Sequence, residues 1–146
     1  MITKDEVREL VNLYKDIFPH IRDDYLSKVI DNGNILYTKD GSGLLGIIIF
    51  KRYVKNTKYV NAGDFELSQI IVKNKGKGIG SSLYYGFERL VIKQGAKSIV
   101  LTVRESNTIA RNFYDKIGMN VVGKISWKNG SIPGLVYKKV LVKTLM

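Results

Sequence analysis

The feature that most constrains this chain is a glycine-rich turn that separates a strand pattern from a helix pattern. Residues 65–72 are typical of a strand with a polar start, and residues 98–103 form a second strand pattern. Between them, the sequence Gly-Lys-Gly-Ile-Gly at 76–80 leads into apolar residues at helical spacing, which end at Gly95. Strand, turn, helix and strand make a βαβ unit, so we expect the two strands to be parallel neighbours.

The rest of the chain is expected to form two helices and a hairpin before this unit, and a helix and a hairpin after it. Thr3 and Glu6 form a capping-box pattern, and the apolar spacing that follows predicts a helix over 4–17. The other expected elements are a shorter helix stopped at 31–33, a hairpin of 35–38 and 44–53, a polar loop over 55–64, a helix over 108–117 and a hairpin of 120–127 and 135–141. This order predicts one α/β domain over 1–146, of the α+β kind, in which a central mixed, mostly antiparallel sheet has helices on both faces.

Composition removes several kinds of site. The chain has no cysteines, which excludes disulfide frameworks, thiolate zinc sites, iron–sulfur clusters and cysteine nucleophiles. Its one histidine, His20, argues against a histidine metal site or a Ser/His/Asp triad, so no metal is expected. The longest apolar run, 44–50, is far shorter than the roughly 20 residues of a membrane span. We therefore expect no membrane partner and a cytoplasmic location.

The charge of the chain is strongly positive and unevenly distributed. It has 24 Lys and Arg against 13 Asp and Glu, a formal charge of +11. Residues 1–50 contain 6 basic and 8 acidic side chains, so all of the positive excess follows residue 50. Such a field attracts anions, which include nucleic acid, a membrane surface and a phosphorylated cofactor. A solvated basic surface is the alternative, and composition does not choose between them.

The glycine turn is suited to phosphate. Closely spaced glycines let the backbone approach a ligand, and the start of a helix offers unpaired N–H groups and partial positive charge. A dinucleotide fingerprint is disfavoured, because Ser81 stands in place of its third glycine and no acid lies between Glu88 and Glu105. A Walker loop is disfavoured because neither Gly-Lys pair precedes Ser or Thr. A tight turn that binds nothing stays the plain alternative. Three lysines surround the turn: Lys73, Lys75 and Lys77.

Two motifs in this region resemble those of the GNAT N-acetyltransferase superfamily. Residues 72–81 resemble its acetyl-CoA loop, Q/R-x-x-G-x-G/A after a strand, with Lys75 where the family prefers Gln or Arg. Residues 107–114 resemble its N-x-x-A-x-x-x-Y helix, followed at 114–119 by a match to Y-x-x-x-G-F. The resemblance implies a GNAT-like fold with a cofactor splay between the two parallel strands, and an acetyl-CoA-dependent N-acetyltransferase, an acyltransferase, that needs no metal.

The resemblance also implies where acetyl-CoA binds. Its pyrophosphate meets N–H groups from Lys77 to Ser81, and its pantetheine arm pairs with the backbone of Ile70 and Val72. Asn107 hydrogen-bonds the pantetheine or a bridging water, although a helix N-cap is an equally plain role for it. The cofactor-binding residues implied in this way are Ile70, Ile71, Val72, Lys75, Gly76, Lys77, Gly78, Ile79, Gly80, Ser81, Asn107, Ala110 and Tyr114.

Two residues are candidates for proton transfer. Tyr114 matches the general acid of the family, which protonates the CoA sulfur, and a phenol keeps its proton at neutral pH. Its alternative role is to pack its helix with Phe113 and Ile117. Glu66 shares a strand face with Ser68 and matches the place where some family members have a glutamate that deprotonates the amine, often through water. Its alternative is a solvated carboxylate.

The acceptor is expected to be a primary amine that attacks the acetyl group directly and passes through a tetrahedral intermediate. A chain with a charge of +11 should repel polyamines and accept neutral or anionic amines, such as amino acids, acidic peptides or an aminoacyl group on tRNA. Many members of the family are dimers, which implies a homodimer here. The alternative hypothesis is a basic nucleic-acid-binding domain with a vestigial CoA-binding fold, although no known nucleic-acid motif is found.

Overall fold

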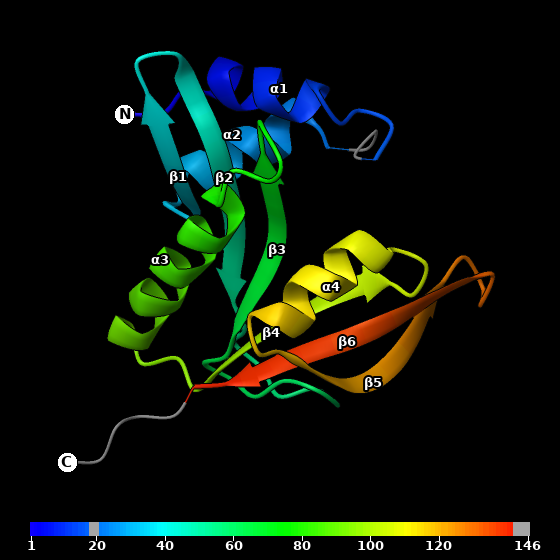
Figure 1. Cartoon of the computed structure of the whole chain (residues 1–146). Helices are drawn as coiled ribbons and strands as arrows, with labels where there is room; N and C mark the ends of the chain where they lie inside the picture. The colour runs from blue at the N-terminus through cyan, green and yellow to red at the C-terminus, as the bar shows by residue number, and fades with distance from the viewer. Residues whose placement is uncertain (18–20, 142–146) are drawn as a thin grey trace. The chain divides into compact units, whose positions relative to one another are not determined.

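The structure, a computed structural model, describes residues 1–17 and 21–141 (Figure 1). His20, the only histidine of the sequence, lies outside the described residues. The elements follow the predicted order of two helices, three strands, a helix, a strand, a helix and two strands. They are α1 (Lys4–Asn12), α2 (Asp23–Asp31), β1 (Ile35–Asp40), β2 (Gly43–Arg52), β3 (Phe65–Val72), α3 (Ile79–Lys93), β4 (Ser98–Arg104), α4 (Thr108–Lys116), β5 (Asn120–Trp127) and β6 (Ile132–Val140).

The strands form one mixed sheet, as the sequence predicts. Their order is β1-β2-β3-β4-β6-β5. Strands β3 and β4 are parallel, with Phe65 opposite Ile99 and Glu66 opposite Val100. The pairs β1–β2, β4–β6 and β5–β6 are antiparallel. The parallel pair confirms the βαβ unit that was inferred from the glycine turn.

The chain divides into two compact units. We call residues 1–50 and 69–89 the N-terminal unit, and residues 51–68 and 90–146 the C-terminal unit. Each unit is described by itself below. A single domain over 1–146 stays a prediction.

In the N-terminal unit, helices cover both faces of the strands. Ile47 and Ile49 of β2 belong to a buried apolar cluster with α1, α2 and Ile71 of β3. Alternate residues of β2 point the other way, where the Phe50 ring lies 5.3 Å from the Phe87 ring of α3. Strand alternation therefore gives β2 two buried faces, which explains its nearly continuous apolar sequence.

The first helix is shorter than predicted. The capping box of Thr3 and Glu6 is present, but α1 ends at Asn12 rather than at 17, and residues 13–17 form turns. The apolar spacing continues past the helix end, yet Leu13 and Ile17 are 56% and 57% exposed, so they gain little from a further helical turn. Tyr14 instead donates its hydroxyl to the carbonyl of Val72 at 2.6 Å, a contact that the helix prediction did not foresee.

In the C-terminal unit, a long loop is fastened to the start of β3. The N–H of Tyr53 donates to the carbonyl of Asp64, and the N–H of Gly63 donates to the carbonyl of Tyr53, both at 2.8 Å. The Asp64 side chain is only 1% exposed, accepts the N–H of Asn61 at 2.8 Å and lies 3.8 Å from Lys138 Nζ. The loop predicted over 55–64 is thus ordered by its own hydrogen bonds.

The closing hairpin begins its second strand earlier than predicted. Lys128, Asn129 and Gly130 all have positive φ and make the turn, after which β6 starts at Ile132 rather than at 135. In β6, Gly134 pairs with Ile125 of β5 and with Arg104 of β4. A Cβ at Gly134 would lie 2.4 Å from the Trp127 ring, so the glycine leaves room for that indole.

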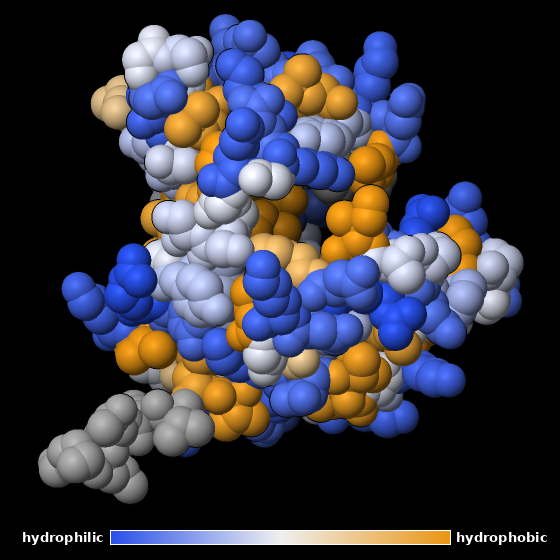
Figure 2. Space-filling model, viewed as in Figure 1, coloured by the Kyte–Doolittle hydropathy of each residue, from blue (hydrophilic) through white to orange (hydrophobic). Residues whose placement is uncertain are grey.

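None of the helices formed by residues 1–17 and 21–141 is long and apolar enough to cross a membrane. Figure 2 shows hydrophilic residues over much of the visible face. The cytoplasmic location stays a prediction.

Candidate active site

The glycine turn lies in the N-terminal unit and is exposed. Lys73 leaves β3 with its N–H bonded to the carbonyl of Leu45 at 2.7 Å. Gly76 and Gly78 have φ of 79° and 76°, in the left-handed region that favours glycine, and a Cβ at either would meet open space. The turn therefore needs glycine for its backbone conformation, and its surface is left clear for a ligand.

The start of α3 offers free N–H groups to this open space. The N–H of Ser82 donates to the carbonyl of Gly78 at 3.0 Å, which makes it the first bond of the helix. The N–H groups of the three preceding residues consequently have no helical acceptor, and no acidic side chain occupies the first turn. A cavity of about 250 Å³ opens here, lined by Thr38, Leu45, Lys77, Gly78, Ile79 and Ser82. This arrangement fits a phosphate group, so the residues present suit the pyrophosphate of CoA.

Tyr14 holds the end of β3 beside the turn. Its hydroxyl binds the Val72 carbonyl, and Lys75 Nζ lies 5.2 Å from the centre of its ring, a cation–π distance. Sequence reasoning missed Tyr14, because its spacing looked like one more position of a helix. Ile71 also differs from expectation in one respect: its side chain is 2% exposed and belongs to the core, so only its backbone can face a cofactor.

Glu66 lies in the C-terminal unit, with hydroxyl donors on both carboxylate oxygens. The Tyr53 hydroxyl donates a hydrogen bond to Oε2, and Ser68 Oγ donates to Oε1 at 2.7 Å. Lys51 Nζ lies 3.9 Å from Oε2. The Glu66 side chain is 24% exposed, so water can still reach it. Burial raises the pKa of Tyr53, and the neighbouring Glu66 raises it further, so the phenol keeps its proton as the donor.

Tyr114 lies on α4 in the same unit and is 8% exposed. Its ring contacts the rings of Phe113 and Tyr137 at 5.6 and 5.8 Å. Burial raises the pKa of Tyr114 to about 12. The phenol is thus kept protonated at neutral pH and can donate a hydrogen bond.

Asn107 has the N-cap role that was the plain alternative in the sequence. Its Oδ1 accepts the N–H of Ala110 at 3.1 Å, which fixes the start of α4. The side chain is exposed, and its amide NH₂ is left to donate elsewhere. Asn107 and Ala110 thereby orient the helix that presents Tyr114.

The predicted site residues fall into two groups by unit. The N-terminal unit contains the strand and turn residues Ile70, Ile71, Val72, Lys75, Gly76, Lys77, Gly78, Ile79, Gly80 and Ser81. The C-terminal unit contains the two candidate catalysts and the α4 residues, which are Glu66, Asn107, Ala110 and Tyr114. Within residues 1–17 and 21–141, no group of three or more metal-ligating side chains is found.

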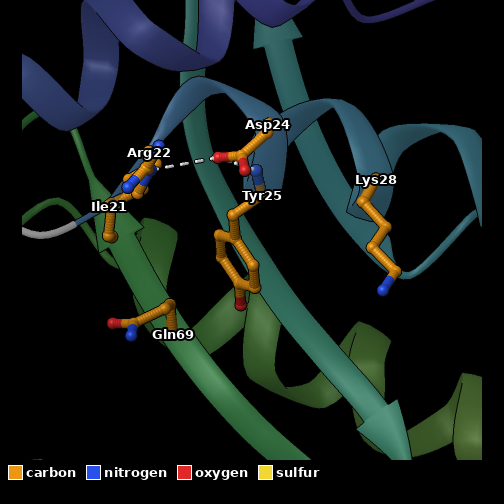
Figure 3. Close-up of a pocket in the computed structure, with 6 residues that line it drawn as sticks. All are labelled: Ile21, Arg22, Asp24, Tyr25, Lys28 and Gln69. Atoms are coloured by element: carbon orange, nitrogen blue, oxygen red, sulfur yellow. Dashed lines mark hydrogen bonds and ion pairs between the residues drawn. The ribbon is translucent and has the colours of Figure 1, made fainter.

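A larger pocket of about 510 Å³ lies in the N-terminal unit and was not predicted (Figure 3). Its apolar wall is Ile21 and the ring of Tyr25, and the amide of Gln69 faces it from β3. Arg22 Nε lies 3.4 Å from Asp24 Oδ1, so these two opposite charges offset each other. Lys28 adds a further positive charge to the lining. Sequence reasoning could not find this pocket, because Gln69 is distant from α2 along the chain.

Comparison with known sequences identifies one family. A sequence model described as the acetyltransferase (GNAT) family matches residues 5–119. Comparison with curated proteins gives no match. The family match covers the glycine turn, β4 and α4, and it includes both predicted motifs.

Several solved structures have the same fold. Ard1 from Thermoplasma volcanium has a TM-score of 0.79 and 15% identity, over 97% of this chain and 95% of its own. Aminoglycoside 6'-acetyltransferase type Ii has a TM-score of 0.77 and 20% identity, over 97% and 92%. The NatC complex bound to Gag peptide and CoA includes a chain with a TM-score of 0.76 and 13% identity, over 95% and 91%. At these identities the likeness shows the fold alone. None of these comparisons supports the nucleic-acid alternative.

Proposed function

The chain belongs to the acetyltransferase (GNAT) family of acetyl-CoA-dependent N-acetyltransferases, and we propose that it moves the acetyl group to a primary amine by direct attack. The observation that supports this most is the open, glycine-built turn at the start of α3, with unpaired N–H groups and a cavity beside it.

The cofactor contacts follow from that turn. We assign the pyrophosphate to the N–H groups between Lys77 and Ser81, with Lys75 as a nearby cation. The pantetheine arm is assigned to the backbone of Ile70 and Val72, on the strand end that Tyr14 holds. Acetyl-CoA supplies the activated thioester, and the chain supplies a fixed backbone to orient it.

Tyr114 is proposed as the proton donor to the departing sulfur. Burial raises its pKa to about 12, whereas an ordinary thiol has a pKa of about 8.5. Complete transfer to a fully formed thiolate would be uphill, so Tyr114 acts by hydrogen-bonding the sulfur while the C–S bond breaks. The thiolate becomes a thiol by taking the proton that the attacking amine loses.

Glu66 is proposed to take the proton of the ammonium form before attack, directly or through water, and to release it to solvent. The second proton, which the attacking nitrogen loses, goes to the sulfur. An amine attacks only as the neutral form, and most primary amines are protonated near neutral pH. The hydroxyls of Tyr53 and Ser68 leave the carboxylate partly exposed, which supports access by water. If Glu66 only attracted the ammonium form, its role would be acceptor positioning.

The acceptor is proposed to be a neutral or anionic amine, either a small molecule or a peptide. The unpredicted pocket supports this class, because its lining contains the cations Arg22 and Lys28 against the single acid Asp24. Such a lining disfavours a polycation. A homodimer stays a prediction.

The test is an acetyl-CoA turnover assay over a panel of amines that includes free amino acids, neutral and acidic peptides, a polyamine and aminoacyl-tRNA. Release of free CoA that depends on one of the neutral or anionic amines supports the proposal. A chain that neither binds acetyl-CoA nor acetylates any member of the panel would contradict it. RNA binding that weakens steeply with salt, without turnover, would favour the nucleic-acid alternative instead.

A further inference from the structure

The candidate base Glu66 does not stand alone in the C-terminal unit. Three side chains lie around its carboxylate: Tyr53 and Ser68 donate hydrogen bonds to it, and Lys51 lies 3.9 Å from Oε2. Strand alternation predicts Ser68 on the same face as Glu66, whereas the contacts of Tyr53 and Lys51 with Glu66 were not predicted from the sequence. Two roles are open to Tyr53: packing of the core alone, or orientation of the Glu66 carboxylate.

The backbone places Tyr53 beside Glu66 by direct pairing. The main chain of Tyr53 exchanges hydrogen bonds with Gly63 and Asp64, just before β3 begins. The pairing continues through the side chains, because the Arg52 guanidinium lies 5.9 Å from the Phe65 ring centre. Tyr53 is therefore fixed at both its backbone and its hydroxyl, and its position is not left to a free loop.

The contacts around the carboxylate restrict its orientation. Tyr53 binds Oε2 and Ser68 binds Oε1, so rotation of the carboxylate would break both hydrogen bonds. Lys51 adds a charge near Oε2, and its Nζ also lies 5.4 Å from the centre of the Tyr53 ring. Lys51 is 57% exposed, so its ion pair contributes little, and the hydroxyls do most of the holding.

We infer that Tyr53 is a positioning residue, which holds the Glu66 carboxylate in the one orientation that can take a proton from the acceptor amine. This inference rests on the proposed function of Glu66. Tyr53 itself transfers no proton in this scheme. Each carboxylate oxygen keeps a second lone pair after accepting its hydroxyl, and that lone pair is available to water or to the amine.

A double-mutant cycle tests the inference, because it separates an effect through Glu66 from an independent one. The four proteins are the unchanged chain, Tyr53→Phe, Glu66→Gln and the double variant, each measured for kcat and for KM of acetyl-CoA. We expect Tyr53→Phe to lower kcat by about tenfold, with KM of acetyl-CoA unchanged. In the Glu66→Gln background, the same change should cost nothing further.

The pH profile gives a readout that a packing role would not move. If Tyr53 acts through Glu66, the loss in Tyr53→Phe should shrink at high pH, where the amine is already neutral, as it should in Glu66→Gln. Tyr59→Phe is the matched control, since Tyr59 packs against the same small core as Tyr53, whereas the side-chain hydroxyls that donate to Glu66 are those of Tyr53 and Ser68. It should leave kcat unchanged at every pH. Ser68→Ala, which removes the second hydroxyl, tests the same role should Tyr53→Phe fail to fold.

Two results would overturn the inference alone. One is a Tyr53→Phe variant that keeps the full kcat while Glu66→Gln loses it. The other is a loss that multiplies fully in the double variant, which would show that the two residues act independently. If Glu66→Gln keeps the full kcat, the proposed base is wrong, and if no amine is acetylated, the proposed function is wrong. These failures are therefore distinguishable.

Discussion

In the N-terminal unit, the groups best placed to bind a ligand are main-chain N–H groups at the start of α3, whereas in the C-terminal unit they are the side chains of Glu66 and Tyr114. A site made of main chain depends on a conformation that only glycine adopts easily. A site made of side chains depends on neighbours that set their orientation and protonation. The two units should therefore fail in different ways when they are mutated.

Charge separates the same two units. The N-terminal unit has ten basic and nine acidic side chains, and the C-terminal unit has fourteen basic and four acidic ones. The unit with the glycine turn is thus nearly neutral, and its positive charge at the turn is local to Lys73, Lys75 and Lys77. Net charge alone points to the other unit as the place for an anion, so the proposed pyrophosphate site depends on oriented dipoles and nearby cations rather than on total charge.

The largest effect is expected from Tyr114→Phe, which removes a hydroxyl and keeps the ring. If Tyr114 hydrogen-bonds the departing sulfur, turnover should fall by about 10²–10⁴-fold, while acetyl-CoA affinity barely changes. Steady-state rates and the melting-temperature shift with acetyl-CoA measure the two quantities. Unchanged turnover would show that Tyr114 is not the donor to the sulfur, and that the C-terminal unit does not contribute to the reaction through this side chain.

Tyr137→Phe is the control for this change. Tyr137 is fully buried, its ring contacts Tyr114, and its hydroxyl accepts a hydrogen bond from Arg111 at 3.3 Å. We expect it to lower stability and to leave turnover within a small factor.

Alkaline unfolding adds a second check on Tyr114. Its pKa is raised to about 12 in the folded chain, so its stabilisation is present below about pH 10 and is lost as pH rises toward 12. The Phe variant should lose less stability over that interval.

The next largest effect is expected from Gly78→Glu in the N-terminal unit. The substitution puts a side chain and a negative charge at the open turn, so acetyl-CoA should bind about 100-fold more weakly or not measurably. Gly33→Glu is the matched control, because Gly33 has a φ of 71° and also faces open space, in the same unit but in the turn that follows α2. Both variants should lose similar stability without ligand. Only Gly78→Glu should lose the melting-temperature shift, and a normal shift there would show that the turn does not bind the cofactor.

A smaller effect, which depends on pH, is expected from Glu66→Gln. At neutral pH most of the acceptor is protonated, so loss of the base should lower turnover by about tenfold or more. Toward about pH 10 more of the amine is neutral, and the variant should approach the rate of the unchanged chain. Rates from about pH 6 to about pH 10 with one acceptor measure this. A loss of the same size at every pH would assign Glu66 to acceptor positioning.

Local patterns in the sequence were enough to predict the order of elements and the parallel pair β3–β4. The glycine turn and the spacing after it are short-range signals, and the rule for parallel connections turns them into topology. The same local reasoning extended α1 too far, because it could not know that Tyr14 would leave the helix to bind the Val72 carbonyl. A contact between residues 14 and 72 has no signature in either segment.

The candidate site likewise includes some contacts that the sequence predicts and others that depend on tertiary packing. Ser68 could be placed beside Glu66 from strand alternation alone. Tyr53 could not, because its contact with Glu66 depends on how the loop between them folds back. The pocket that contains Gln69 and Lys28 is likewise made by segments far apart in the sequence. Motifs led to the proposal of which residues bind the cofactor, and tertiary packing decides which partners those residues have.

The smallest effect is expected from Lys75→Arg, which sharpens the contrast by testing a side chain within a backbone site. Arg keeps the positive charge, can bind phosphate through two parallel hydrogen bonds, and can still stack on the Tyr14 ring, from which Lys75 Nζ lies 5.2 Å. Acetyl-CoA affinity should stay the same or rise by less than about tenfold, as measured by titration. Lys58→Arg is the control, because Lys58 Nζ lies 5.4 Å from the Tyr59 ring in the other unit and should have no effect. A large loss in Lys75→Arg would mean that the compact ammonium group on Tyr14 holds the turn in place, and that side-chain packing matters to this site as much as its backbone does.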